Sequence, residues 1–128
     1  MAVKLINDVR SKLAVSLNVG DGSVRVLAGH GVRFPTLDTA GDWFPLAIED
    51  VNGNIEYLHA TARNGDEITV IRSQEGSIER GFPAGSLCEL RLTVAALDAR
   101  IEMMIEQGGG TPVNNSAVAD VSDGTLGD

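Results

Sequence analysis

The stretch from Ile55 to Leu92 reads IEYLHATARNGDEITVIRSQEGSIERGFPAGSLCELRL. Two strand-like runs flank Asn64-Gly65, a pair that is typical of type I′ turns between antiparallel strands. A further turn signal follows at Gln74-Glu75-Gly76, and a charged connection then leads into a closing strand. The stretch therefore predicts an antiparallel meander.

The residues before this stretch extend the same pattern. Trp43 to Val51 predicts a strand, and Asn52-Gly53 predicts another type I′ turn because both residues tolerate positive φ. Residues 12–19 alternate in hydrophobicity, Asp21-Gly22 indicates a tight turn, and residues 23–27 alternate again. This arrangement predicts a β-hairpin near the N-terminus.

Composition agrees with a small β domain. The chain has 128 residues, of which 43% are hydrophobic and 4% aromatic, and it contains 15 glycines. A chain of this length supports one modest core, built here mainly from Val, Ile, Leu and Ala. We expect a mainly β fold: a small antiparallel β-barrel or sandwich over residues 11–92, followed by a short C-terminal helix.

The helix is predicted from Thr93, which can cap its N-terminus, to Gln107. Four apolar residues, spaced three, four and three apart, match the a/d seam of a coiled coil: Val94, Leu97, Ile101 and Met104. Two readings remain open. The helix packs on its own sheet, or it forms a short parallel seam on the axis of an oligomer.

The two ends of the chain differ from the domain between them. Residues 1–10 mix apolar and charged side chains and predict a short helix or an N-terminal arm that lies on a neighbour. Residues 108–128 hold three acidic residues and no basic or aromatic residue, and they predict a flexible acidic tail. We expect at least one of these ends to become ordered only on a partner.

Charge and cysteine content narrow the class of partner. The net charge of -8 disfavours contact with nucleic acid. The sequence shows no signal peptide, membrane-length apolar run, metal-ligand spacing or phosphate-binding glycine motif, so we expect no membrane partner and no cofactor. Its single cysteine, Cys88, lies in an apparent strand and is expected to be a small buried residue rather than a nucleophile.

The remaining polar residues do not form a catalytic pattern. His30 and His59 lie far apart in the sequence and are expected to have ordinary polar roles. Three carboxylates, those of Glu75, Glu79 and Glu89, are candidates for the acid–base pair of a glycosidase. We expect them instead to form ion pairs with Arg72, Arg80 and Arg91. The chain also has few aromatic residues with which to line a sugar cleft. We therefore expect no enzymatic activity.

Particular motifs across residues 1–98 resemble a small β domain of tailed-bacteriophage virion proteins, found at the start of tail fibres. The matching elements are Trp43-Phe44-Pro45-Leu46, Thr61-Ala62-Arg63, Asn64-Gly65-Asp66, Ile68 to Arg72, Gln74-Glu75-Gly76, Arg80, Phe82-Pro83-Ala84-Gly85 and Glu89 to Thr93. The resemblance implies a structural protein of the virion, assembled in the host cytoplasm as a homotrimer that binds phage capsid or tail proteins.

Two positions on a virion are compatible with the resemblance: a capsid decoration or cement protein or short fibre-like accessory, and an adaptor at the tail, neck or collar. Fibre relatives continue into long shafts, so the short C-terminal part expected here slightly favours decoration. A carbohydrate-binding module is a further alternative. Candidate virion contacts are Val3, Leu5, Ile6, Gln74, Glu75, Arg80 and Phe82.

Overall fold

A computed structural model describes residues 2–6 and 8–107. The chain divides into two units, residues 1–96 and 97–128, which are described separately. The predicted tail at residues 108–128 lies outside the described residues. The elements of the described part are β1 (Arg10–Lys12), β2 (Ser23–Arg25), the 3-10 turn η1 (Gly31–Arg33), β3 (Phe44–Glu49), β4 (Ile55–Asn64), β5 (Glu67–Gln74), β6 (Leu87–Leu90) and α1 (Val94–Gln107).

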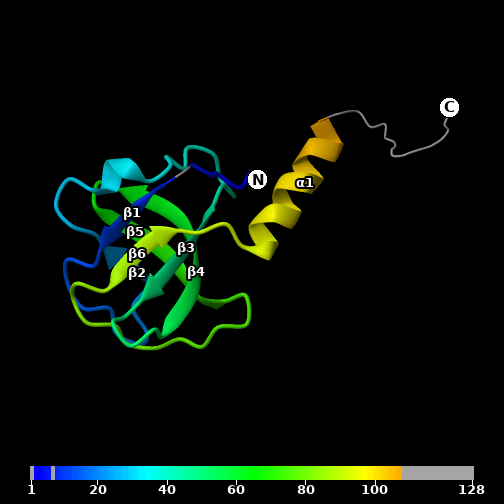
Figure 1. Ribbon diagram of the computed structural model, residues 1–128. Helices are drawn as coiled ribbons and strands as arrows, with labels where there is room; N and C mark the ends of the chain where they lie inside the picture. Colours follow the sequence, from blue (N-terminus) through cyan, green and yellow to red (C-terminus); the bar gives the residue numbers. More distant parts are fainter. Residues whose placement is uncertain (1, 7, 108–128) are drawn as a thin grey trace, which may run out of the picture. The chain divides into compact units, whose positions relative to one another are not determined.

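The strands of the first unit form one antiparallel sheet in the order β1-β6-β3-β4-β5-β2. The sheet curls strongly (Figure 1), and its two outer strands approach each other beyond their ends. Leu13 forms an antiparallel bridge with Val26, supported by bonds from Ala14 N to Arg25 O (2.8 Å) and from Leu27 N to Lys12 O (3.1 Å). The fold is therefore mainly β, a curled half-barrel followed by a short helix, as the sequence predicted.

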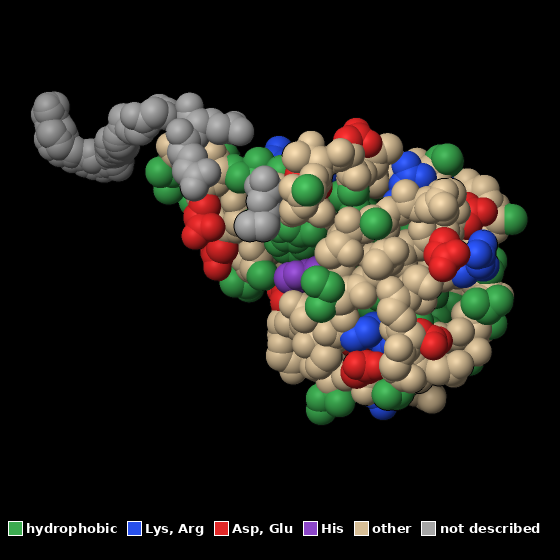
Figure 2. All heavy atoms as spheres, turned by 180° about the vertical axis from the view of Figure 1, so that it is seen from behind, with side chains coloured by type: hydrophobic (Ala, Val, Ile, Leu, Met, Phe, Trp, Pro, Cys, Tyr) green, Lys and Arg blue, Asp and Glu red, His purple; other side chains and the backbone are tan. Residues whose placement is uncertain are grey.

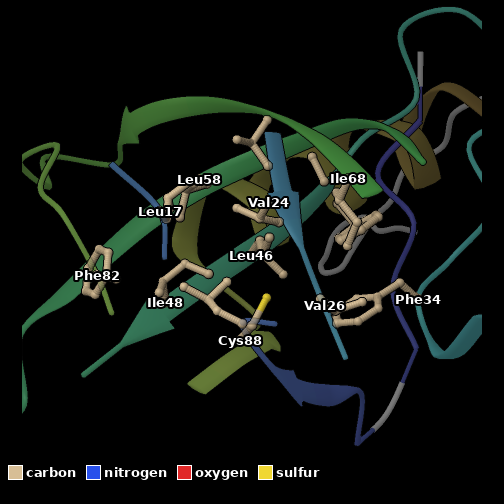
Figure 3. Packing of buried hydrophobic residues seen from close by; sticks show 14 of the residues in the cluster. Leu17, Val24, Val26, Phe34, Leu46, Ile48, Leu58, Ile68, Phe82 and Cys88 are labelled. Carbon is tan, nitrogen blue, oxygen red and sulfur yellow. The ribbon is translucent and has the colours of Figure 1, made fainter. Parts of the chain in front are cut away.

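The core fills the inside of the curl. Side chains from several strands point into the same interior, as Figure 3 shows for Val24, Leu46 and Cys88. Phe34, from the loop after η1, stacks on Phe44 with ring centroids 5.8 Å apart. Cys88 is fully buried, as predicted, and burial raises the pKa of its thiol.

The predicted N-terminal hairpin is only partly formed. β1 ends at Lys12 and pairs with β6, while β2 pairs with β5, so the two segments lie at opposite ends of the sheet order. The chain between them turns at Asn18 to Asp21, where Asp21 N donates to Asn18 O (3.0 Å) and Gly20 has φ 94°. The alternation of residues 12–19 places Leu13 and Leu17 in the core without a continuous strand, because each contacts a different distant segment.

Both Asn-Gly pairs lie in turns, but neither turn is type I′, which requires positive φ at both central residues. After β3, Gly53 N donates to Asp50 O (3.1 Å), and Gly53 has φ 84° while Asn52 does not have a positive φ. Between β4 and β5, Asn64 pairs with Glu67, so the central residues are Gly65 and Asp66. Gly65 alone has positive φ (63°), the pattern of a type II′ turn.

The described part of the N-terminal segment packs on its own domain instead of extending as an arm. Trp43 N donates to Ala2 O (2.9 Å), and Lys4 N donates to Trp43 O (2.8 Å). Val3 and Val9 are buried, at 1% and 5% exposure. Backbone hydrogen bonds to Trp43 and the two buried valines hold these residues on their own domain, and an arm that lies on a neighbour stays a prediction.

The helix begins at Val94, directly after the predicted cap residue Thr93. Thr93 Oγ1 accepts a hydrogen bond from Ala96 N (3.2 Å), which is the capping interaction expected of this residue. Ala96 in the first turn is fully buried. No helix in the described part of the chain is long and apolar enough to cross a membrane.

Candidate functional site

A buried ion pair stands at one end of the curled sheet. Glu56 on β4 faces the interior with no exposed surface, and the side chain of Arg72 on β5 is only 7% exposed. Arg72 Nε donates to Glu56 Oε2 and Arg72 Nη2 donates to Glu56 Oε1, both at 2.9 Å. This two-bond geometry is the strongest arrangement that a guanidinium and a carboxylate form.

Further hydrogen bonds tie the pair to the surrounding backbone. Glu56 accepts from Ser73 N (2.9 Å) and Arg80 N (3.0 Å). The Arg72 guanidinium donates to three carbonyl oxygens, those of Asn18 (2.8 Å), Asp21 (3.1 Å) and Arg80 (2.7 Å). The pair thus joins β4, β5, the turn at residues 18–21 and the long connection before β6.

The protonation of Glu56 follows from this environment. Burial alone raises the pKa of a carboxyl group, but the hydrogen bonds from Arg72 and from the N–H groups of Ser73 and Arg80 outweigh burial, so the pKa of Glu56 lies below its usual value. The carboxylate is therefore ionised at neutral pH and already bonded by four donors. Such a group holds structure together and is poorly suited to exchanging protons with a substrate.

A strained turn follows the pair. Ser73 and Glu75 have positive φ (59° and 57°) although neither is glycine, and Gly76 also does (80°). Ser73 Oγ donates to Ser77 O (2.7 Å), and Ser77 N donates to Gln74 O (3.0 Å). These bonds hold the turn in a conformation that most side chains disfavour.

The strained turn positions the carboxylate of Glu75. Its Oε2 lies 3.2 Å from His59 Nε2, and its Oε1 accepts from Ala95 N at 3.4 Å. His59 in turn stacks on Trp43, with ring centroids 4.1 Å apart. The expected arginine partner of Glu75 was therefore wrong, because this turn directs the side chain toward β4 and the start of α1.

The other predicted ion pairs differ in their outcome. Glu89 accepts from Arg91 Nε at 2.8 Å, as predicted for this pair. Glu79 Oε2 lies 3.7 Å from Arg72 Nη1 and also accepts from Gly20 N (2.5 Å). Both carboxylates thus have structural partners, but only those of Glu79 lie across turns, because Glu89 and Arg91 are two residues apart at the end of β6.

The predicted virion contacts do not form one surface. Val3 and Phe82 are buried, at 1% and 2% exposure, and Phe82 also pairs with Leu17 through two backbone hydrogen bonds. Gln74 is half-buried and donates to Arg72 O (3.0 Å). Ile6 and Arg80 remain exposed, whereas the side chain of Glu75 is only 15% exposed. Contact of this set with other virion proteins stays a prediction.

The predicted seam of α1 is exposed, with Val94 at 76%, Leu97 at 46%, Ile101 at 45% and Met104 at 64%. Ile105, at 64%, extends this apolar stripe because it lies four residues after Ile101. Sequence reasoning missed Ile105, although its spacing from Ile101 carried the signal. Figure 2 shows apolar side chains in separate places among charged ones on the visible face.

A hollow of about 280 Å³, lined mainly by aliphatic residues, was not anticipated. It is lined by Leu5, Ile6, Asp8, Leu90 and Leu92. Two of these side chains remain substantially exposed, Ile6 at 49% and Leu92 at 58%. Sequence reasoning could not find the hollow, because its two sides lie more than 80 residues apart in the chain.

The histidines have separate polar partners. His30 Nδ1 lies 2.7 Å from Ser11 Oγ, and His59 contacts Glu75. Within residues 2–6 and 8–107, no group of three or more His, Cys, Asp or Glu side chains could hold a metal ion. Comparison with known proteins adds no assignment: no family model matches this chain, and no curated protein is significantly similar to it.

Proposed function

We propose that this protein is a structural, non-enzymatic component of a tailed-phage virion that binds other virion proteins. The observation that carries the proposal is the position of the motif residues that resemble the phage domain. Arg72 and the backbone of Arg80 belong to the buried ion-pair network, and Phe82 lies in the core. These motif residues are thus residues that this fold needs, and this supports the proposal.

Asp66 belongs to the same group of motif residues. Its carboxylate accepts from Gly29 N (3.0 Å) and Gly31 N (2.8 Å), which lower its pKa below the usual range. It thereby ties the turn between β4 and β5 to the loop before β3. These motif residues stabilise the fold and bring no reactive groups together. This supports a structural role in assembly.

We favour a capsid decoration protein or a short fibre-like accessory protein. The alternative is an adaptor at the tail, neck or collar. The test is to express the tagged chain in the host during phage production and to purify particles by density gradient. Quantitative mass spectrometry should find the chain in a fixed ratio to the capsid or tail proteins. Its absence from purified particles would reject the proposal.

A carbohydrate-binding module has less support from the aromatic residues. Phe34, Phe44 and Phe82 are buried in the core, and one face of Trp43 lies against His59. Sugar recognition usually needs aromatic rings available for stacking. A glycan array with the isolated protein separates the two classes, because reproducible binding to one glycan family would favour the module.

We further propose that the protein assembles as a homotrimer through the exposed seam of α1. Complete burial of an aliphatic side chain contributes about 1.5–3 kcal/mol, so four roughly half-exposed seam residues contribute about 4 kcal/mol per helix. Association itself costs about 4–15 kcal/mol. Burial of the seam therefore offsets only the lower end of this cost, and surfaces of the β domain must add to it.

The seam has a direct test in the double change Leu97→Asp and Ile101→Asp. Opposing carboxylates in an apolar interface are costly, so light scattering should report a monomer in place of a trimer. Circular dichroism checks that the β domain remains folded. A wild-type monomer at tens of micromolar would refute the trimer of the isolated protein.

A further inference from the structure

Three aliphatic side chains project from loops at one end of the curled sheet. Val19 lies in the turn of residues 18–21 and is 67% exposed. Val51, in the turn between β3 and β4, is 98% exposed, and Ile78, in the connection between β5 and β6, is 79% exposed. Single exposed aliphatic residues are common, but several on neighbouring loops mark an interaction site more often.

A direct contact joins the first and third of these loops. Gly20 N donates to Glu79 Oε2 (2.5 Å), and these two residues directly follow Val19 and Ile78 in the chain. In Figure 1 the connection between β5 and β6 runs along the lower end of the sheet. Val19 and Ile78 are therefore exposed on neighbouring loops at the same end.

The turn between β3 and β4 lies near the same connection and is held by hydrogen bonds. Asp50 Oδ1 accepts from Asn52 N and from Asn54 N, both at 2.9 Å. Hydrogen bonds from Asn54 and the positive charge of Arg80 lower the pKa of Asp50, so the guanidinium lies close enough to act on this turn. The loop-end surface is formed by the three loops at residues 18–21, 50–54 and 77–80.

The buried ion pair fixes two of the three loops. Arg72 donates to the carbonyl oxygens of Asn18 and Asp21, and also to that of Arg80. Glu56 accepts from Arg80 N. A buried ion pair is weak evidence for stability, because desolvation offsets the attraction of the charges. Its bonds here hold the loop-end surface in one conformation, and a surface that is fixed before binding loses less conformational entropy on association.

Charge indicates the kind of partner. The loop-end surface carries three carboxylates, those of Asp21, Asp50 and Glu79, and one guanidinium, that of Arg80. A second copy of this chain would bring the same excess of carboxylates, so self-association through this surface is disfavoured. Nucleic acid is repelled for the same reason. A protein surface with Lys or Arg around an apolar depression is complementary in both charge and polarity.

We propose that the loop-end surface docks on another virion protein, with Val19 and Ile78 inserted into an apolar depression that is rimmed by Lys or Arg side chains. The inference rests on the proposed virion role and names the surface that performs it. It uses no residue of the α1 seam, so docking on the particle and formation of the trimer are separate events.

One experiment compares exposed aliphatic residues at the two ends of the sheet. Val19→Asp and Ile78→Asp place a carboxylate in the proposed contact. The matched control is Val32→Asp, because Val32 is 77% exposed and lies on η1, beside the turn between β4 and β5 at the other end of β4. Each tagged variant is expressed during phage production at a supply that leaves wild-type sites partly filled. Urea midpoints check that each variant is folded.

The measured quantity is the copy number of the chain per purified particle. Val19→Asp and Ile78→Asp should each lower it by about tenfold or more, the size expected of a central contact. Val32→Asp should leave it within about twofold of the wild type. An equal loss in all three variants would overturn the inference, because the site of the added charge would then not matter.

Carbodiimide cross-linking of purified particles tests the chemistry of the partner. The reagent activates a carboxyl group, and a lysine amine then displaces it as a urea and forms an amide, so only groups in direct contact are joined. Mass spectrometry should find Asp21 or Glu79 joined to a lysine of a capsid or tail protein. Cross-links of these residues only to a second copy of this chain would overturn the inference.

The outcomes separate this inference from the virion role. Absence of the wild-type chain from purified particles would overturn both. A wild-type chain that enters particles, with Val19→Asp and Ile78→Asp entering equally well, would overturn the loop-end surface alone and leave the virion role in place.

Discussion

Removal of the buried ion pair should be among the most damaging changes to the β domain. Glu56→Leu leaves the Arg72 guanidinium nearly buried without its carboxylate, and it leaves the N–H groups of Ser73 and Arg80 without their acceptor. Breaking one side of such a pair costs about 3–5 kcal/mol. Small domains have total stabilities of about 5–15 kcal/mol, so the variant should be close to unfolding.

Removal of the other partner, Arg72, tests whether the loss of stability comes from the ion pair rather than from Glu56 alone. Arg72→Met leaves Glu56 with two backbone donors and removes the donor to the carbonyl groups of Asn18, Asp21 and Arg80. Arg72→Met should therefore lower the free energy of unfolding by about as much as Glu56→Leu does. The double variant Glu56→Leu/Arg72→Met removes both charges of the pair. Its loss of unfolding free energy should therefore be smaller, by about 2 kcal/mol or more, than the summed losses of the two single variants.

Urea unfolding, followed by circular dichroism, measures these differences. With a slope of about 2 kcal/mol per molar urea, a loss of 4 kcal/mol lowers the midpoint by about 2 M. The control is the ion pair of Arg25 with Glu67, which has the same 2.9 Å separation but side chains 51% and 49% exposed. Arg25→Met should cost at most about 1 kcal/mol.

Two results would refute this reasoning. If Glu56→Leu costs no more than Arg25→Met, burial does not make the pair important. If the losses from Glu56→Leu and Arg72→Met simply add, the two side chains act independently and the hydrogen-bond network is not a unit.

Three further predictions follow from individual contacts. Gly31→Ala should destabilise the domain by about 2 kcal/mol or more in urea unfolding, because a Cβ would lie against the backbone carbonyl of Gly65. Gly53→Val and Gly65→Val should each lower stability by about 1–3 kcal/mol through positive φ alone, since both positions have open space for a side chain; unchanged melting temperatures would contradict this. Acid should destabilise the wild type: the pKa of Glu56 is lower folded than unfolded, so its contribution is complete above the unfolded pKa, near 4.3, and is lost as pH falls through the folded pKa. The loss of stability between pH 6 and pH 3 should be smaller in the double variant Glu56→Leu/Arg72→Met than in the wild type, as measured by urea midpoints.

Local features of the sequence were sufficient to predict the class of fold. The strands β3 to β6 lie where alternation and turn residues indicated them, and α1 begins after the Thr93 cap. The turns near Gly53 and Gly65 were correctly placed, although their types were not. Alternation, capping and glycine conformation act over a few residues, so they can be recognised in the sequence alone.

Long-range contacts decided the features that the sequence left hidden. Nothing local indicates that Glu56 faces inward, because its stability there depends on Arg72, sixteen residues away. The same holds for the hairpin predicted from residues 12–19 and 23–27. It forms only at the bridge between Leu13 and Val26, while β1 pairs with β6 and β2 pairs with β5. The hollow at Ile6 exists only because the N-terminal segment packs beside the end of β6. Burial, pairing partners and concave surfaces arise when distant segments meet, and their energies belong to the folded arrangement rather than to any one stretch of chain.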